Sequence, residues 1–295
     1  MNQRETRRQF LTSSLAAGMA ASATGWSSRS ARALDKPSSP LLGLGLMTYN
    51  LARDWDLDTI IRNCTETRFE HVELRTTHAH GVEVTLSKVE RREIRKRFAD
   101  AGLKLSLASA FAYHWDDPQK LHGNIKGTKE YTLLAEDIGA IGIRVFPNAL
   151  LAGQGIPEEK TVAQIASAVV EVGTFAAEHG VEIRLANHGR GTNRVTVIKK
   201  VFDAADCEHV YMNWNCDRTD IEAPGFEANF NSVKDRIRNL HIHDLNDPVY
   251  PYRQLFALLR KNGYQGYCDA EVPASPEPIR FMREYRTRFL ALQDA

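Results

Sequence analysis

Residues 161–189, TVAQIASAVVEVGTFAAEHGVEIRLANHG, contain a helix pattern, a strand pattern and a polar end, in that order. The first part predicts an amphipathic helix, whose apolar stripe comprises Val162, Ile165, Ala166, Val169, Val172 and Ala176. Gly180 can cap the end of this helix. The apolar run that follows predicts a strand ending at Ala186, directly before Asn187 and His188. The segment therefore predicts a helix that leads the chain back into a buried strand.

The same alternation of apolar runs with helical segments extends from Leu41 to the end of the chain. Eight runs predict strands, at residues 44–49, 71–74, 103–109, 143–146, 181–186, 210–214, 240–242 and 267–271. A second clear helix pattern, with Ile94 and Phe98 on its buried stripe, spans residues 85–101. Eight strands separated by helices close naturally into a barrel, and the length of 295 residues suits the typical barrel of about 250. We therefore expect a single α/β domain, a (β/α)8 TIM barrel, over residues 34–295.

Residues 1–33 have the three parts of an export signal. Arg7 and Arg8 precede Phe10, a mildly apolar and Ala-rich run spans residues 15–24, and residues 31–33 fit a small-x-small cleavage site. This pattern resembles a twin-arginine signal peptide. The apolar run is too short and too weakly apolar to predict a stable membrane span. We expect residues 1–33 to be removed and the barrel to work in the periplasm or otherwise outside the inner membrane.

Composition and charge narrow the range of partners. The formal net charge is +1, and acidic and basic residues are mixed along the chain. Neither nucleic acid nor an anionic membrane is therefore expected as a partner. No CxxC pair or zinc-ribbon spacing joins the four cysteines, Cys64, Cys207, Cys216 and Cys268. Buried thiols are favoured, a disulfide stays open, and the oligomeric state stays unknown.

Polar and ionisable residues follow most of the predicted strands. In chain order they are Tyr49-Asn50, Glu73 with His78 and His80, Tyr113-His114-Trp115, Pro147-Asn148, Asn187-His188, Asn213-Trp214-Asn215, His241-Ile242-His243-Asp244 and Glu271. In a (β/α)8 barrel the loops after the strands build the active site. Histidines at four strand ends and glutamates at two therefore predict a functional site at that end of the barrel.

Four motifs at the ends of the last four predicted strands carry a family resemblance. They are Arg184-Leu185-Ala186-Asn187-His188-Gly189, Asn213-Trp214-Asn215, Leu240-His241-Ile242-His243-Asp244 and Ala270-Glu271-Val272-Pro273. In this order and placement they resemble the xylose isomerase-like barrel superfamily, the sugar phosphate isomerases/epimerases. Residues 78–83 further resemble exported members from environmental bacteria. The resemblance covers residues 34–295 at the level of the fold and implies a small carbohydrate as the partner.

The resemblance also implies a divalent metal, held by Glu after strand five, Asp after strand six, His on strand seven and Glu on strand eight. His241 and Glu271 match this set, whereas Ala186 has no ligand atom and Asn215 offers a neutral carbonyl oxygen. We expect Asn215, His241 and Glu271 as metal ligands, with Mn, Mg, Co or Zn as candidate cations. The lost carboxylates weaken the hold on a hard cation and put the metal in doubt. Two histidines could replace a missing ligand, namely His188 and His243.

An isomerase or epimerase of this kind removes and returns a proton beside a sugar carbonyl. Glu271 is the candidate base, and its catalytic partner is His188 or Glu73. The loss of one carboxylate fits a one-base reaction, such as elimination or hydration of a keto-sugar, at least as well. Tyr49, Trp115 and Trp214 offer flat faces for sugar stacking or for the core. The candidate substrate-binding residues are Tyr49, His78, His80, His114, Trp115, Trp214 and His243.

Other classes of function remain open beside the enzyme. A sugar-binding or accessory barrel that has lost catalysis fits Ala186 and Asn215. An apurinic endonuclease shares the fold, but it needs a larger cluster of His, Asp and Glu and a basic surface, and export would remove its substrate. It ranks last. A glycoside hydrolase would need Glu73 and Glu271 suitably spaced across the barrel.

Overall fold

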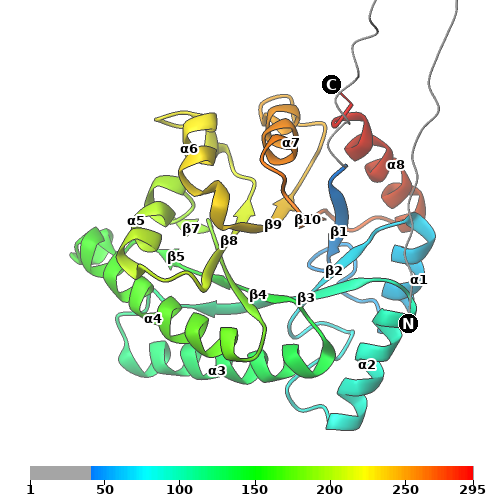
Figure 1. Cartoon of the computed structure of the whole chain (residues 1–295), viewed down its shortest axis with the longest axis horizontal. Coiled ribbons are helices and arrows are strands. Elements are labelled where there is room, and N and C mark those ends of the chain that lie inside the picture. The colour runs from blue at the N-terminus through cyan, green and yellow to red at the C-terminus, as the bar shows by residue number, and fades with distance from the viewer. Residues whose placement is uncertain (1–40, 295) are drawn as a thin grey trace, which may run out of the picture. The chain divides into compact units, whose positions relative to one another are not determined.

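Eight strands pair in parallel and close into a barrel within residues 41–294, the residues that the computed structural model describes (Figure 1). The strands are β1 Gly43–Met47, β2 His71–Arg75, β3 Lys104–Ala112, β4 Gly142–Phe146, β6 Glu182–Ala186, β8 Val210–Asn215, β9 Ile237–Ile242 and β10 Tyr267–Ala270. Around the barrel their order is β1-β10-β9-β8-β6-β4-β3-β2. Each strand coincides with one of the eight predicted runs, so the predicted (β/α)8 barrel is confirmed.

Helices follow the strands and surround the barrel (Figure 1). They are α1 Leu57–Thr67, α2 Lys88–Asp100, α3 Pro118–Ile138, α4 Glu158–Glu178, α5 Val195–Ala205, α6 Phe226–Val233, α7 Tyr252–Lys261 and α8 Pro278–Ala291, with short 3-10 turns η1 Ala152–Gln154, η2 Arg218–Ile221 and η3 Lys234–Arg236. The predicted apolar stripe of α4 is buried from Val162 to Ala176, as are Ile94 and Phe98 on α2. Among residues 41–294, no helix combines the length and the apolarity needed to cross a membrane.

Polar caps and glycines set the ends of the helices. The side chain of Asp56 accepts a hydrogen bond from the backbone nitrogen of Thr59 at 2.8 Å and begins α1. Ser87 and Glu90 form a capping box at the start of α2. Gly102 follows α2 with a φ of 70°, a left-handed conformation that favours glycine. The capping box fixes where α2 begins, and Gly102 fixes where it ends and therefore where β3 can begin.

A two-stranded sheet joins the loops after β4 and β6. It pairs β5 (Asn148–Ala149) with β7 (Gly189–Arg190) and was not predicted from the sequence. Gly189 has a φ of 97°, and a Cβ there would lie 1.7 Å from the carbonyl oxygen of Asn148. Glycine is therefore required for this close approach. The pairing fixes the loop that begins with His188.

Two other expectations concern the N-terminal segment and the cysteines. The predicted twin-arginine signal, residues 1–33, lies outside the described residues. All four cysteines are free thiols, and three of them are buried, Cys64, Cys216 and Cys268. This agrees with the interpretation of the cysteines as small apolar side chains of the core.

Candidate active site

A cavity of about 200 Å³ lies at the carboxyl ends of the barrel strands. Five residues predicted for the site line it, namely Tyr49, His188, Asn215, His241 and Glu271. Ala186, which stands where the resemblance implied a metal-binding Glu, lines it as well. The structure therefore brings residues from distant parts of the chain together around one small space.

A larger cavity, of about 640 Å³, lies at the opposite ends of the strands. Glu182, Arg184 and Arg238 line it, and the carboxylate of Glu182 pairs with the two arginines at 2.7 and 3.4 Å. Both arginines are thus engaged by a carboxylate, and the described lining of this cavity contains no histidine. The smaller cavity is therefore the candidate active site, at the end of the barrel where this fold places its chemistry.

His241 lies between two carboxylates. Its Nε2 contacts Oε2 of Glu73, and its Nδ1 lies 3.2 Å from Oε2 of Glu271. Burial by itself lowers the pKa of His241, but the charge of Glu73 and the hydrogen bonds of both glutamates outweigh it and raise that pKa to about 9. Burial raises the pKa of Glu271, whereas the bond to His241 and the charges of His241, His243 and Arg144 bring it down to about 2. At neutral pH the pair is therefore an imidazolium and a carboxylate.

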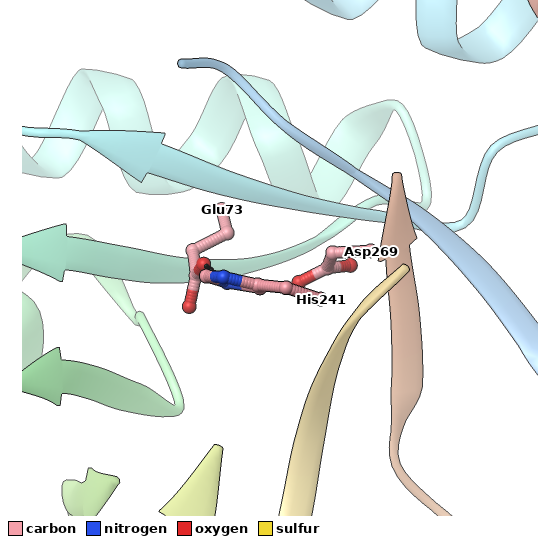
Figure 2. Close-up of side chains that lie close together, drawn as sticks. All are labelled: Glu73, His241 and Asp269. Carbon is pink, nitrogen blue, oxygen red and sulfur yellow. Dashed lines mark hydrogen bonds and ion pairs between the residues drawn. The ribbon is translucent and has the colours of Figure 1, made fainter. Parts of the chain in front are cut away.

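A buried polar network continues below His241, between β2, β9 and β10 (Figure 2). Nδ2 of Asn239 donates to Oε1 of Glu73 at 3.2 Å and to Oδ2 of Asp269 at 2.9 Å. Nδ1 of His71 lies 2.7 Å from Oδ1 of Asp269. The candidate ligand atoms of Glu73, His241 and Asp269 lie within 4.8 Å of one another, and this buried group could hold a metal ion.

The metal site that the resemblance implies does not fit the wall of the cavity. Ala186 supplies no donor atom, and both ring nitrogens of His241 already face carboxylates. The guanidinium groups of Arg75 and Arg144 line the same cavity and would repel a cation. A hard divalent cation prefers several anionic oxygens, and Glu271 is the one carboxylate on the described wall. We therefore derive no catalytic step from a metal.

Arg75, Arg144 and Phe146 line the cavity, although sequence reasoning did not single them out. Arg144 is 3 % exposed, and its Cζ lies 4.0 Å from the centroid of the Phe146 ring. Burial lowers the pKa of Arg144 from the ordinary arginine value. A signal was present in the sequence, because Arg144 interrupts an apolar run and alternates with Ile143 and Val145, which are fully buried.

His188 stands at the rim of the cavity, with its ring centroid 4.6 Å from that of Phe146. The preceding Asn187 fixes the loop, because its Nδ2 donates to the carbonyl oxygen of Asn215 at 2.9 Å and its Oδ1 accepts from the backbone nitrogen of Asn215 at 2.7 Å. Partial burial and the charge of Arg144 lower the pKa of His188. His188 is therefore a neutral imidazole at neutral pH and can accept a proton.

Glu73 is fully buried behind His241 and does not line the cavity. Glu73 therefore does not lie where it could exchange a proton with a substrate in this cavity, which corrects the expectation from the sequence, and its carboxylate contacts Nε2 of His241 instead. A glycoside hydrolase needs two carboxyl groups that both reach the glycosidic bond. Glu73 and Glu271 do not meet this requirement, because only Glu271 reaches the described cavity wall.

Trp214 points from β8 toward α6 and away from the cavity. Its indole is fully buried against Phe226 and Phe230, and its Nε1 donates to the hydroxyl of Tyr250 at 2.9 Å. Successive side chains of a strand face opposite sides, and Asn215 takes the side that faces the cavity. Trp214 is therefore a core residue, which corrects the expectation of a sugar-stacking surface.

The remaining predicted substrate-binding residues lie around the cavity without lining it, namely His78, His80, His114, Trp115 and His243. The ring of His78 stacks on that of Tyr49 with 6.2 Å between centroids. Nε2 of His80 lies 2.7 Å from the carbonyl oxygen of Arg75 and shapes the loop after β2. These two histidines therefore support residues of the cavity wall.

The loops after β3 and β9 carry the other three of these residues. The rings of His114 and Trp115 contact each other, with 4.4 Å between centroids. Nδ1 of His243 lies 3.1 Å from the main-chain oxygen of Glu271. His243 therefore fixes the backbone of Glu271, whereas His114 and Trp115 are not among the residues that line the cavity.

Comparisons with known proteins agree with this architecture. A family model described as xylose isomerase-like TIM barrel matches residues 61–287. The structure resembles apo 3-keto-D-glucoside 4-epimerase YcjR from E. coli, with a TM-score of 0.70 and 15 % identity over 85 % of this chain and 99 % of that chain. It also resembles the probable 3-DHS dehydratase AsbF from Bacillus anthracis, with a TM-score of 0.66 and 14 % identity over 83 % and 99 % of the two chains.

A third similar structure is the IOLI protein with a binding zinc atom, with a TM-score of 0.66 and 16 % identity over 85 % of this chain and 96 % of that chain. No curated protein matches the sequence. At such low identities the structural similarity shows a shared fold, and the chemistry has to be argued from the residues of the cavity.

Proposed function

This chain belongs to the xylose isomerase-like TIM barrel family, and from that premise we propose that it is a carbohydrate-active enzyme of the isomerase or epimerase kind. It removes a proton next to a sugar carbonyl and returns it. One observation carries the proposal: the cavity combines a neutral imidazole, His188, with an ionised carboxylate, Glu271. The names of the similar structures, an epimerase and a probable dehydratase, support this class of chemistry.

Each group has a distinct part in the proposed reaction. His188 takes the carbon-bound proton, because Glu271 with a pKa of about 2 binds protons too weakly to be an effective base. This reverses the order of the two residues expected from the sequence. Glu271 accepts a hydrogen bond from a substrate hydroxyl, while His241 orients its carboxylate and Glu73 orients His241. The proton of that hydroxyl passes to the former carbonyl oxygen, and His188 then returns its own proton to the neighbouring carbon, which gives the isomer.

The same first step serves two related reactions. Protonation of the same carbon on its opposite face by a water molecule, with the proton of His188 released to the resulting hydroxide, gives an epimer. Departure of a neighbouring hydroxyl as water, with the proton that His188 carries, gives an elimination product. A sugar-binding barrel without catalysis is the second candidate, because Ala186 and Asn215 have removed two carboxylates from the family's ligand set. The two candidates differ in one observable, the exchange of a carbon-bound hydrogen with solvent.

Deuterium exchange tests the proposal. The full chain, incubated in D2O with a set of aldoses and keto-sugars, should replace the hydrogen next to the carbonyl by deuterium at a rate that NMR measures. His188→Asn should lower this rate by about 100-fold or more, since a general base contributes roughly 10²- to 10⁴-fold. Glu271→Gln should also lower the rate, through a weaker hydrogen bond to the substrate. Treatment with a chelator should leave the wild-type rate unchanged, because protein groups supply every proposed step.

His209→Asn is the matched control, because His209 is a partly exposed histidine beside Glu208 and does not line the cavity. It should exchange deuterium at the wild-type rate. Wild-type exchange in His188→Asn would contradict the assignment of the base. If sugars bind in calorimetry but exchange no carbon-bound hydrogen, the non-catalytic sugar-binding barrel is the correct candidate and the enzyme is not.

A further inference from the structure

We propose that the cavity recognises its substrate by an anionic group, a carboxylate or a phosphate, which Arg144 and Arg75 bind. The inference rests on the proposed function and narrows its substrate class from sugars in general to sugar acids or sugar phosphates. Neither arginine takes part in the proton transfer proposed above. The bonding of the two side chains carries the inference.

Arg144 is a buried cation that forms no direct ion pair within residues 41–294. Its Nη1 donates to the carbonyl oxygen of Ser109 at 2.8 Å, and its buried Nε has no hydrogen-bond partner within residues 41–294. No carboxylate of the described chain forms an ion pair with it. A guanidinium that is removed from water without a counterion is strongly unfavourable. Glu73 and Glu271 act on Arg144 without contacting it and both hold His241, so the position of a direct anionic partner is left for a ligand.

Phe146 holds the guanidinium of Arg144 in one plane. The two side chains stack at 4.0 Å, and both line the cavity. A guanidinium is a rigid fork of donors that matches the paired oxygens of a carboxylate or a phosphate. With one nitrogen tied to Ser109 and its face against Phe146, Arg144 is already oriented before a ligand arrives.

Arg75 adds a second positive charge from the end of β2. Its Nη1 donates to the carbonyl oxygen and to Oγ1 of Thr76, at 2.7 and 2.8 Å, and it too lacks an ion pair in the described part of the chain. Two carboxylates act on Arg75 without pairing with it: Glu83, which accepts from Thr77 and Tyr131, and Glu271, which holds His241. Among the described residues that line the cavity, two arginines and the imidazolium of His241 face one carboxylate, Glu271, so the charge of the lining is positive.

A buried arginine at the other end of the barrel, where no ligand is expected, forms an ion pair. Arg184 is 2 % exposed on β6, and its Nε and Nη2 donate to Oε2 of Glu182 at 2.9 and 2.7 Å. A carboxylate two residues away thus neutralises it. Arg144 on the adjacent strand has no such partner and lines the cavity instead.

Calorimetric titration of the full chain with matched probes tests the inference. D-glucuronate carries a carboxylate, D-glucose 6-phosphate carries a phosphate, D-glucose carries neither, and inorganic phosphate is the simplest oxyanion. An anionic probe should bind about 10- to 100-fold more tightly than glucose, as expected for hydrogen bonds to a charged group. The probe that binds more tightly tells a carboxylate from a phosphate. If no anionic probe, inorganic phosphate included, binds more tightly than glucose, the inference is overturned.

Variants locate the effect. Arg144→Met should weaken binding of the anionic probe by at least about tenfold more than it weakens binding of glucose. Arg238→Gln removes the same charge at the other end of the barrel and should change neither affinity. Equal losses of affinity for the anionic probe in these two variants would mean that the net charge of the protein explains the effect, and would overturn the inference. If Arg144→Met does not fold, Arg75→Gln, whose side chain is half-buried, provides the same comparison.

Failure of the inference and failure of the proposed function give different results. Tight anion binding without deuterium exchange in any sugar would support the anion site and contradict the proposed enzymatic function. Deuterium exchange on neutral sugars at a rate that neither arginine variant alters would support the enzymatic function and contradict the anion site.

Discussion

His241 is the side chain on which the charges of the site converge. Glu73 and Glu271 hold its two ring nitrogens, and Asn239 ties Glu73 to Asp269. Removing one member of a buried ion pair leaves the other uncompensated, which is strongly destabilising. The orientation of Glu271 at the cavity wall therefore depends on Glu73, a residue that does not reach the cavity.

Replacing Glu73 by Gln should flatten the pH dependence of stability. The pKa of His241 rises from 6.5 to about 9 on folding, so its contribution is fully present below 6.5 and is lost as the pH rises through about 9. A shift of this size corresponds to at most about 3 kcal/mol. Glu73→Gln keeps an acceptor oxygen but removes the charge, so the pKa of His241 should fall and the pH-dependent part of the stability should shrink with it.

Urea unfolding across that pH range measures this change. Glu66→Gln is the control, because Glu66 is a surface carboxylate on α1 that pairs with Arg283. The control should keep the wild-type slope of stability against pH. Identical slopes in Glu73→Gln and the wild type would mean that the charge of Glu73 does not hold the proton on His241.

The strands explain which parts of the site could be predicted from the sequence. Strand positions followed from apolar runs, but a barrel strand is buried on both faces, so its run hides which side chains face inward. For this reason Trp214 was assigned to the site and Arg144 was missed, although alternation along β8 and β4 separates them. Contact between Glu73 and His241 could not be predicted, since 168 residues separate them and the closed barrel brings them together.

Gly45 on β1 tests how closely the strands pack around the buried network. A Cβ there would lie 1.8 Å from Oδ1 of Asp269 and 2.9 Å from Nδ1 of His71, so Gly45→Ala must separate this pair or move β1. We expect a loss of roughly 1–3 kcal/mol in unfolding free energy, as for an overpacked core. Gly153→Ala, where a Cβ meets nothing within 4 Å, should be neutral. Equal stabilities of the two variants in urea unfolding would show that the network has room to adjust.

At the scale of the whole barrel, the two ends differ in whether their arginines form ion pairs. Glu182 forms ion pairs with Arg184 and Arg238 at the amino-terminal ends of the strands, whereas Arg75 and Arg144 at the carboxyl ends form no ion pair within residues 41–294. The barrel could be predicted because eight runs and their helices repeat along the sequence. The difference in ion pairing could not, because it depends on which side chains pair after the barrel closes.

The N-terminal segment gives the last prediction, which concerns where the whole molecule works. We propose export by the twin-arginine route, because Arg7 and Arg8 precede an apolar run and a small-x-small site at residues 31–33. Changing both arginines to lysine keeps the charge but removes the pair that the export receptor recognises. The precursor should then stay in the cytoplasm at full length, while the wild type appears in the periplasm shortened by about 33 residues. Cell fractionation followed by mass spectrometry of the N-terminus measures both outcomes, and replacing Arg4 by lysine provides the control. Normal processing of the double variant would contradict the twin-arginine assignment.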